Sequence, residues 1–253
     1  MDASATEYHP NCDGVHYYLT VADIISHANE AVAFDPARLI GAEPVRRIPG
    51  RNSTKADVLF FDLGDQRVAV KSYAPRGALI RNTLGRWLIR REAAAYEAAA
   101  EVAALPAFLG RPEPYVLATE WVDAEPLKAK EGAVLDDALF DRLAAILDEL
   151  HGRGVALADL HHRDVLLTAD GRIYLVDLAT AWVLGPRPGP LRRRLFDRFR
   201  ESDRVNLARM RARFTGGDVE AAVASVSPEA AAWHRRGRRV KGWLDRLRGR
   251  RRE

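Results

Sequence analysis

Three charged residues stand at the ends of apolar segments in this chain. Lys71 ends the run VAVK, Asp159 follows in LADL, and Asp177 ends the run LVD. A cation that binds nucleotide phosphates, a carboxylate that holds Mg²⁺ and a carboxylate beside an attacking hydroxyl are the groups that phosphoryl transfer requires. The three residues could supply them in this order, provided that the fold brings them together.

The first half of the chain predicts strands and one helix. Residues 43–73 are typical of three antiparallel strands, PVRRI, VLFFDL and RVAVKSY, with a Gly64–Asp65 turn before the third. Residues 84–104 are rich in strong helix formers and predict a helix. Two short strands are expected around 108–109 and 115–121. These elements would form a small β-rich lobe.

The second half predicts mainly helices. Residues 136–151 have apolar positions at helical spacing and are followed by Gly152 and Gly154, which favour a helix end. The strands VLLT and RIYLVDL, joined by an Ala-Asp-Gly turn at 169–171, predict a hairpin. The pattern beyond Pro190 is helical again. The sequence therefore predicts an α+β fold.

Composition indicates an ordinary globular protein and places the positive charge in one segment. The chain has 253 residues, 47% of them hydrophobic, with one cysteine and a net charge of +4. Residues 234–253 alone carry +8, which leaves the preceding 233 residues at −4. Nucleic-acid binding by the folded body is therefore not expected. A secretory leader, a disulfide framework and a membrane-spanning run are not apparent, so we expect a soluble, cytoplasmic protein.

The segment from residue 150 to 181, LHGRGVALADLHHRDVLLTADGRIYLVDLATA, resembles the catalytic and metal-binding loops of atypical kinases. The RIO-type and lipopolysaccharide (Kdo or heptose) kinase-like families are the most similar. This resemblance implies a bilobal protein-kinase-like fold, with a β-rich N-lobe over 37–123 and an α-helical C-lobe over 124–225. Residues 1–36 would be an extension with one helix, and 226–253 a basic amphipathic tail.

The same resemblance assigns roles within an ATP and Mg²⁺ site. Lys71 would contact the α- and β-phosphates, and Glu92 would hold it by an ion pair. Asp159 would orient the acceptor hydroxyl and accept its proton. Asp177 would bind the metal, and Asp164 stands where these families usually have an asparagine as second metal ligand. Carboxylate oxygens suit Mg²⁺, so this difference is chemically tolerable.

The segment PGRNSTKAD stands where such enzymes cover the phosphates with a glycine-rich loop, yet it contains only Gly50. Backbone contacts to the phosphates would therefore depend on Asn52, Ser53 and Thr54. This glycine-poor loop and the aspartate at 164 favour an alternative hypothesis, a pseudokinase that binds nucleotide or scaffolds a partner.

The acceptor and the two chain ends leave further alternatives open. The hydroxyl could belong to a protein Ser/Thr or to a sugar or glycolipid. In the tail, Val240, Trp243, Leu244 and Leu247 follow helical spacing among Lys and Arg, a pattern compatible with peripheral contact with an anionic inner membrane surface or with packing on the C-lobe. The spacing of His9, Cys12 and His16 is only weakly indicative of zinc.

Overall fold

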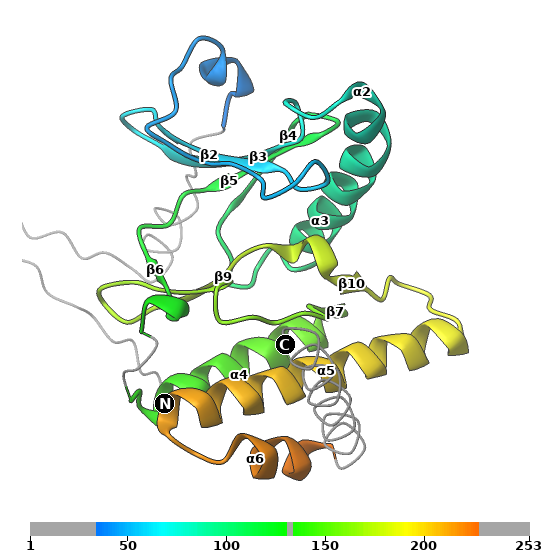
Figure 1. Ribbon diagram of the computed structural model, residues 1–253. Helices are drawn as coiled ribbons and strands as arrows, with labels where there is room; N and C mark the ends of the chain where they lie inside the picture. The colour runs from blue at the N-terminus through cyan, green and yellow to red at the C-terminus, as the bar shows by residue number, and fades with distance from the viewer. Residues whose placement is uncertain (1–33, 131–133, 228–253) are drawn as a thin grey trace, which may run out of the picture. The chain divides into compact units, whose positions relative to one another are not determined.

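The computed structural model describes residues 34–130 and 134–227 (Figure 1). The chain divides into two units, Met1–Ala37 and Arg38–Glu253, and nearly all of the described residues belong to the second. A short 3₁₀ turn, η1 (Pro36–Leu39), spans the division. Three expectations concern residues outside the described ranges: most of the N-terminal extension with its one helix, the His9–Cys12–His16 pattern and the apolar stripe of the tail. No helix within the described ranges is long and apolar enough to cross a bilayer.

The first half of the second unit is a five-stranded antiparallel sheet. Its strands are β1 (Arg46–Ile48), β2 (Asp57–Asp62), β3 (Arg67–Ser72), β4 (Phe108–Glu113) and β5 (Val116–Glu120). They lie in the order β1-β2-β3-β5-β4, which confirms the predicted meander. Gly64 has a φ of +87° in the turn before β3, a conformation that glycine adopts without strain. This sheet places Lys71 at its centre, between β2 and β5.

One long helical segment flanks the sheet in Figure 1. It runs through α2 (Ala78–Ile80), a π-helical stretch η2 (Arg81–Gly85) and α3 (Arg86–Ala98). The prediction of a helix over 84–104 was wrong at both ends. Residues 99–105 form successive turns instead, because these turns bury Ala99, Val102 and Leu105 in the core. Burial outweighs the helix propensity of the alanines there.

The second half is helical around two small sheets. Its elements are β6 (Glu125–Pro126), η3 (Leu127–Lys130), α4 (Asp137–Gly152), β7 (Val155–Ala156), β8 (Val165–Leu167), β9 (Ile173–Leu175), η4 (Leu178–Thr180), β10 (Trp182–Val183), α5 (Pro190–Thr215) and α6 (Val219–Val226). The β8–β9 hairpin and the helix after Leu135 confirm the predictions. Asp136 caps α4 by accepting a hydrogen bond from the Ala138 amide. Figure 1 shows α4 and α5 side by side, with the two small sheets between them and the large sheet.

The largest hydrophobic core cluster joins the two halves. It contains Tyr73 just after β3, Leu117 on β5 and Ile89 on α3, together with Phe140 and Leu175 from α4 and β9. We call the part with the five-stranded sheet the N-lobe and the helical part the C-lobe. Because the apolar contacts continue from one lobe to the other, residues on facing elements are held at defined distances.

Candidate active site

Lys71 and Glu92 form the ion pair expected between them. The Lys71 Nζ lies 2.8 Å from Glu92 Oε2. β3 carries the lysine, and α3 carries the glutamate, whose side chain is only 3% exposed. Burial raises the pKa of Glu92, although Lys71 and the Leu178 backbone act against it. A buried carboxylate needs such a partner, so the pair fixes α3 against the sheet.

Asp177 contacts the same ammonium from the C-lobe. Its Oδ1 lies 2.6 Å from Lys71 Nζ, and its side chain is 51% exposed. The residue has a φ of +62°, a left-handed conformation that is rare outside glycine and directs the chain sharply from β9 into η4. Burial opposes ionisation of Asp177, but Lys71 and then Lys55 outweigh it and lower its pKa. Asp177 is therefore an anion at neutral pH.

Asp164 and Asp159 add two further carboxylates. Burial raises the pKa of Asp164 to about 7, and the negative charges of Asp177 and Asp159 add to that rise. The carboxylates of Asp177 and Asp159 are therefore both close enough to Asp164 to oppose its ionisation. Asp159 itself is exposed and follows Ala158, which has a φ of +67°. Glu92, Asp177 and Asp164 all lie near one ammonium, and together they leave a surplus of negative charge that a divalent cation could offset.

A cavity of about 500 Å³ lies between the lobes and contains most of these groups in its wall. Lys71, Glu92, Asp164 and Asp177 line one part of it. The remaining wall is largely apolar and includes Val58, Ala69, Leu117, Leu166 and Val176. An apolar slot with a few charged groups at one end suits a planar base joined to a polar chain. Asp159 is not part of the wall, and it acts on the site through its proximity to Asp164.

The loop between β1 and β2 lies differently from what the sequence suggested. Asn52, Ser53 and Thr54 are exposed and do not line the cavity, whereas Lys55 does. The Asn52 side chain accepts hydrogen bonds from the Thr54 amide and hydroxyl at 3.1 and 2.8 Å. The loop thus closes on itself, and the assignment of these three residues to phosphate contact stays a prediction.

Asp57, at the start of β2, fixes this loop through hydrogen bonds and ion pairs. Its carboxylate is 1% exposed, accepts a hydrogen bond from the Gly50 amide at 2.9 Å and pairs with Arg47 and Arg76. Burial opposes its ionisation, but these partners lower its pKa. Arg76 also donates to the Lys55 carbonyl at 2.7 Å. The network positions Lys55 at the cavity, a role that a polar loop sequence does not reveal.

A second buried carboxylate supports the loop before Asp159. Asp203 on α5 is fully buried and accepts a hydrogen bond from the Leu157 amide at 2.8 Å. It also lies 3.0 Å from His151 Nε2. The left-handed Ala158 and then Asp159 follow directly, so Asp203 fixes the start of their loop. Sequence reasoning missed Asp203 because an aspartate in a charged helix ordinarily faces solvent.

Arg91 links α3 to the segment after Asp177. Its Nε donates to the Ala181 carbonyl at 3.0 Å, and a terminal nitrogen donates to the Thr180 carbonyl at 2.7 Å. Because Glu92 is the next residue, these bonds hold the middle of α3 and the segment after Asp177 together. The position next to Glu92 was the only sequence signal for it.

The number of carboxylate ligands in the cavity limits the kind of metal site that it could form. In the described part of the chain, no group of three His, Cys, Asp or Glu side chains is arranged to hold a metal ion. Mg²⁺ commonly takes only one or two protein carboxylates, with waters and substrate phosphates as the other ligands. Asp164 and Asp177, which share the cavity wall, fit that smaller demand together with a nucleotide.

Comparison with known proteins agrees with the fold. No protein-family model matches the sequence, and neither does any curated protein. Among solved structures, the chain is similar to the Rio2 kinase from Chaetomium thermophilum, with a TM-score of 0.53 and 16% identity. The match covers 83% of this chain and 68% of that one. At this identity the likeness concerns the fold alone, and the lipopolysaccharide-kinase resemblance stays a prediction. The chain therefore has a protein-kinase-like α+β fold, with a β-rich N-lobe and a helical C-lobe.

Proposed function

We propose that this chain is an ATP- and Mg²⁺-dependent phosphotransferase that acts on a hydroxyl acceptor. One observation carries the proposal: Lys71 lies between Glu92 and Asp177 in the wall of a cavity that also contains Asp164. A lysine on the protein surface ordinarily points into solvent and does not form ion pairs with two carboxylates from separate elements. The burial of one of these carboxylates makes a chance contact a poor explanation. The arrangement suits a site for a polyphosphate and a divalent cation.

Each residue would have a defined part in the reaction. Lys71, fixed by Glu92, would hold the nucleotide phosphates, and Asp177 with Asp164 would hold Mg²⁺. The bound metal would offset the phosphate charge. Asp159 would orient the acceptor hydroxyl and take its proton as the new oxygen–phosphorus bond forms. The bond from the γ-phosphorus to the bridging oxygen breaks, and ADP leaves.

The acceptor is proposed by class only. A protein Ser/Thr hydroxyl and a sugar or glycolipid hydroxyl both fit the chemistry, since either donates one proton to a carboxylate. An acceptor at an anionic membrane surface would also give the basic tail a role. Incubation with labelled ATP and a protein extract or a lipid extract would distinguish the classes by the fraction that gains the label.

A pseudokinase is the second candidate, and one observation favours it. The β1–β2 loop is closed by its own hydrogen bonds and leaves Asn52, Ser53 and Thr54 outside the cavity wall. Binding of nucleotide without turnover would then be the function.

Two measurements test the proposal. The first is the melting temperature with ATP, with and without Mg²⁺, and the second is ATP turnover of the wild type and of Asp159→Asn. We expect Mg²⁺-dependent stabilisation in both proteins and turnover in the wild type only. Asp148→Asn, a change at an exposed surface pair with Arg204, is the control and should behave as the wild type. Equal turnover by Asp159→Asn would refute the assignment, and binding without turnover in the wild type would favour the pseudokinase.

Lys71→Met should abolish most nucleotide-dependent stabilisation while the protein still folds. Lys128→Met, an exposed lysine on η3, serves as its control.

A further inference from the structure

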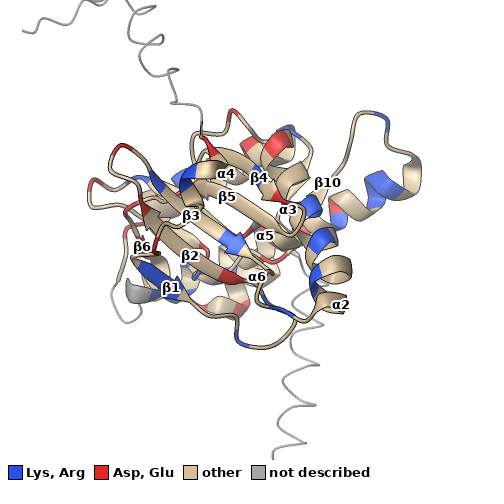
Figure 2. Ribbon diagram, turned by 90° about the horizontal axis from the view of Figure 1, so that it is seen from above, with Lys and Arg blue, Asp and Glu red and all other residues tan. Residues whose placement is uncertain are grey.

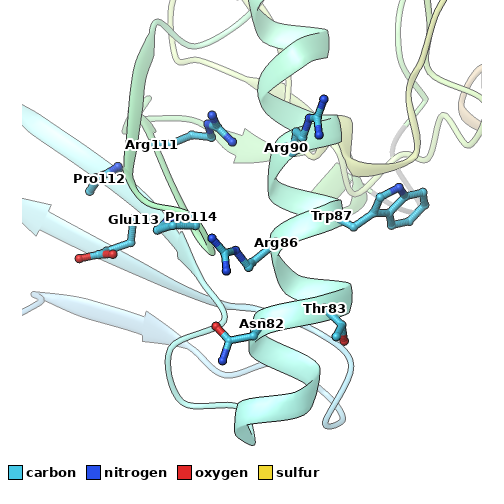
Figure 3. A pocket seen from close by; sticks show the side chains of 9 residues that line it. All are labelled: Asn82, Thr83, Arg86, Trp87, Arg90, Arg111, Pro112, Glu113 and Pro114. Atoms are coloured by element: carbon cyan, nitrogen blue, oxygen red, sulfur yellow. The ribbon is translucent and has the colours of Figure 1, made fainter.

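A second cavity lies on the N-lobe, away from the residues of the active site. It has a volume of about 720 Å³ and lies between the helical segment η2–α3 and the end of β4 (Figure 3). Nine residues line it: Asn82, Thr83, Arg86, Trp87, Arg90, Arg111, Pro112, Glu113 and Pro114. None of them lines the cavity between the lobes. Its lining includes three arginines, two from α3 and one from β4.

No protein group that the structure describes balances these three arginines. Within residues 34–130 and 134–227, the side chains of Arg86, Arg90 and Arg111 form no ion pair or hydrogen bond, and all three are exposed. The one acid in the lining, Glu113, points away from the guanidinium groups in Figure 3. The cavity therefore carries three positive charges and one distant negative charge.

The sequence around α3 concentrates positive charge there. Between Asp65 and Glu92 the chain has no acid but seven Lys and Arg. Arg86 and Arg90 are four residues apart and share one helix face, an arrangement that costs stability for like charges. Figure 2 shows several basic turns along this helix. Surface helices usually place acids at such spacing, and this helix does not.

Two neighbouring arginines of the same helical segment form contacts with the rest of the fold. Arg81 donates to the Ala74 carbonyl and stacks over Tyr115, and Arg91 donates to the carbonyls of Thr180 and Ala181. These two arginines stabilise the fold. Arg86 and Arg90 make no such contact, so structural support does not explain them.

The strand side of the cavity is irregular in a way that reorients side chains. β4 shifts register against β5 twice, between Phe108 and Gly110 and between Gly110 and Glu113. Gly110 has a φ of +112°, which side-chain-bearing residues rarely adopt. Irregularities of this kind turn a side chain out of the normal alternation. In Figure 3, Arg111 points from the strand toward α3, where Arg86 and Arg90 lie.

We propose that this cavity, defined by Arg86, Arg90 and Arg111, binds a phosphate monoester on a polypeptide segment. Guanidinium groups bind phosphate through paired hydrogen bonds, and three of them offer more donors than one carboxylate can accept. A phosphate monoester has three terminal oxygens and a charge of about −1.5 to −2, which matches such a cluster.

The shape of the site favours a polypeptide over other anions. The lining is mostly exposed and carries four charged side chains, unlike the enclosed apolar pockets that hold small molecules. The three arginines line one cavity, whereas nucleic acid calls for a series of cations along its backbone. Pro112, Pro114 and the half-exposed Trp87 offer apolar contact for side chains beside the phosphate. The site does not depend on the activity of the cleft.

The test uses random-sequence peptides with one central phosphoserine, labelled with fluorescein, and the same pool without phosphate. Fluorescence anisotropy with the full chain at physiological ionic strength should show at least about tenfold tighter binding of the phosphorylated pool, given the strength of charge-assisted hydrogen bonds. Inorganic phosphate should compete. Arg86→Ala/Arg90→Ala/Arg111→Ala should lose this preference, and Lys71→Met should keep it.

Two further variants separate the site from general charge. Arg187→Ala/Arg194→Ala/Arg198→Ala removes the same charge from exposed positions elsewhere and should bind as the wild type. Replacement of the three cavity arginines by lysine keeps the charge without the paired geometry and should still weaken binding. Circular dichroism of each variant checks the fold.

Several results would overturn the proposal. They are equal binding of both peptide pools, no binding of either pool, and equal losses in the cavity and control alanine variants. A fourth is arginine-dependent binding that is tighter for a single-stranded oligonucleotide or for phosphatidylserine vesicles than for the phosphopeptides. That outcome would assign the cavity to a different class of partner.

Discussion

The aspartate at 164 should make the protein less stable above neutral pH than the variant Asp164→Asn. Its pKa is raised from 3.8 to about 7 by burial and then by the charges of Asp177 and Asp159. A carboxyl with a raised pKa in the folded state holds its proton more tightly there than in the unfolded chain. Its contribution to stability is therefore complete below pH 3.8 and is lost as the pH rises to about 7.

The loss of stability can be calculated from the difference between the ordinary pKa of Asp164 and its raised pKa in the folded state. At roughly 1.4 kcal/mol for each pH unit, the difference corresponds to about 4 kcal/mol above pH 7. The carboxyl is only partly buried, so water screens much of the repulsion, and we expect about 1 to 2 kcal/mol. For a domain of this size, that raises the melting temperature of Asp164→Asn by about 3 to 6 °C at pH 8.

The assay is thermal unfolding of the wild type and Asp164→Asn between pH 5 and 8. Near pH 5 the two should melt together, because the wild-type carboxyl is neutral like the amide. Addition of Mg²⁺ at pH 8 should stabilise the wild type more than the variant, since the cation offsets the carboxylate repulsion. Asp148→Asn should show a difference that does not vary with pH. A pH-independent gap for Asp164→Asn, or a variant that is less stable at pH 8, would refute the reasoning.

Three other substitutions test how the site is held. Asp57→Ala should destabilise the protein by about 3 kcal/mol, because it leaves half-buried Arg76 without its partner and removes the acceptor of the Gly50 amide, and denaturant unfolding measures this. Gly50→Ala should also destabilise, since a Cβ would lie 2.7 Å from the Ala56 carbonyl oxygen; isothermal titration should show weaker nucleotide binding, and an unchanged melting temperature would contradict the packing argument. Asp203→Asn should cost about 1 to 3 kcal/mol, the penalty for an imperfectly paired buried group, and should lower turnover more than nucleotide affinity, because Asp203 supports the loop of Asp159.

The strands and the charged ends of the site could be predicted because their signals are local. The alternation of VLFFDL and RVAVKSY, with a turn between them, determines which strand carries Lys71. The β8–β9 hairpin is likewise determined by two apolar runs and the turn at 169–171. The ion pair of Glu92 with Lys71 was expected from the resemblance to atypical kinases, since Glu97 and Glu101 lie on the same helix and the local pattern does not single out one glutamate.

The supporting residues could not be predicted because their signals are not local. Asp203 occurs in a helix whose sequence, LRRRLFDRFRESDRV, is charged on most sides, and only the packing of α5 against α4 and β7 buries it. The helix end at Ala98 depends on contacts with the core that propensity does not include. Asn52, Ser53 and Thr54 were assigned by position in a loop, and the loop conformation is determined by Asp57 and Arg76.

The two carboxylates that meet Lys71 are not equivalent, and their burial explains how the site can both hold its shape and exchange ligands. Glu92 has a 3% exposed side chain, so loss of its partner would leave a buried charge, and this pair belongs to the fold. Asp177 is 51% exposed on the left-handed turn before η4, so water or a cation can replace the ammonium at modest cost. A lysine held on one side by a buried partner and on the other by an exchangeable one keeps its position when the second contact is lost. That asymmetry is what a cleft needs if a metal ion is to take Asp177 while Lys71 remains beside the phosphates.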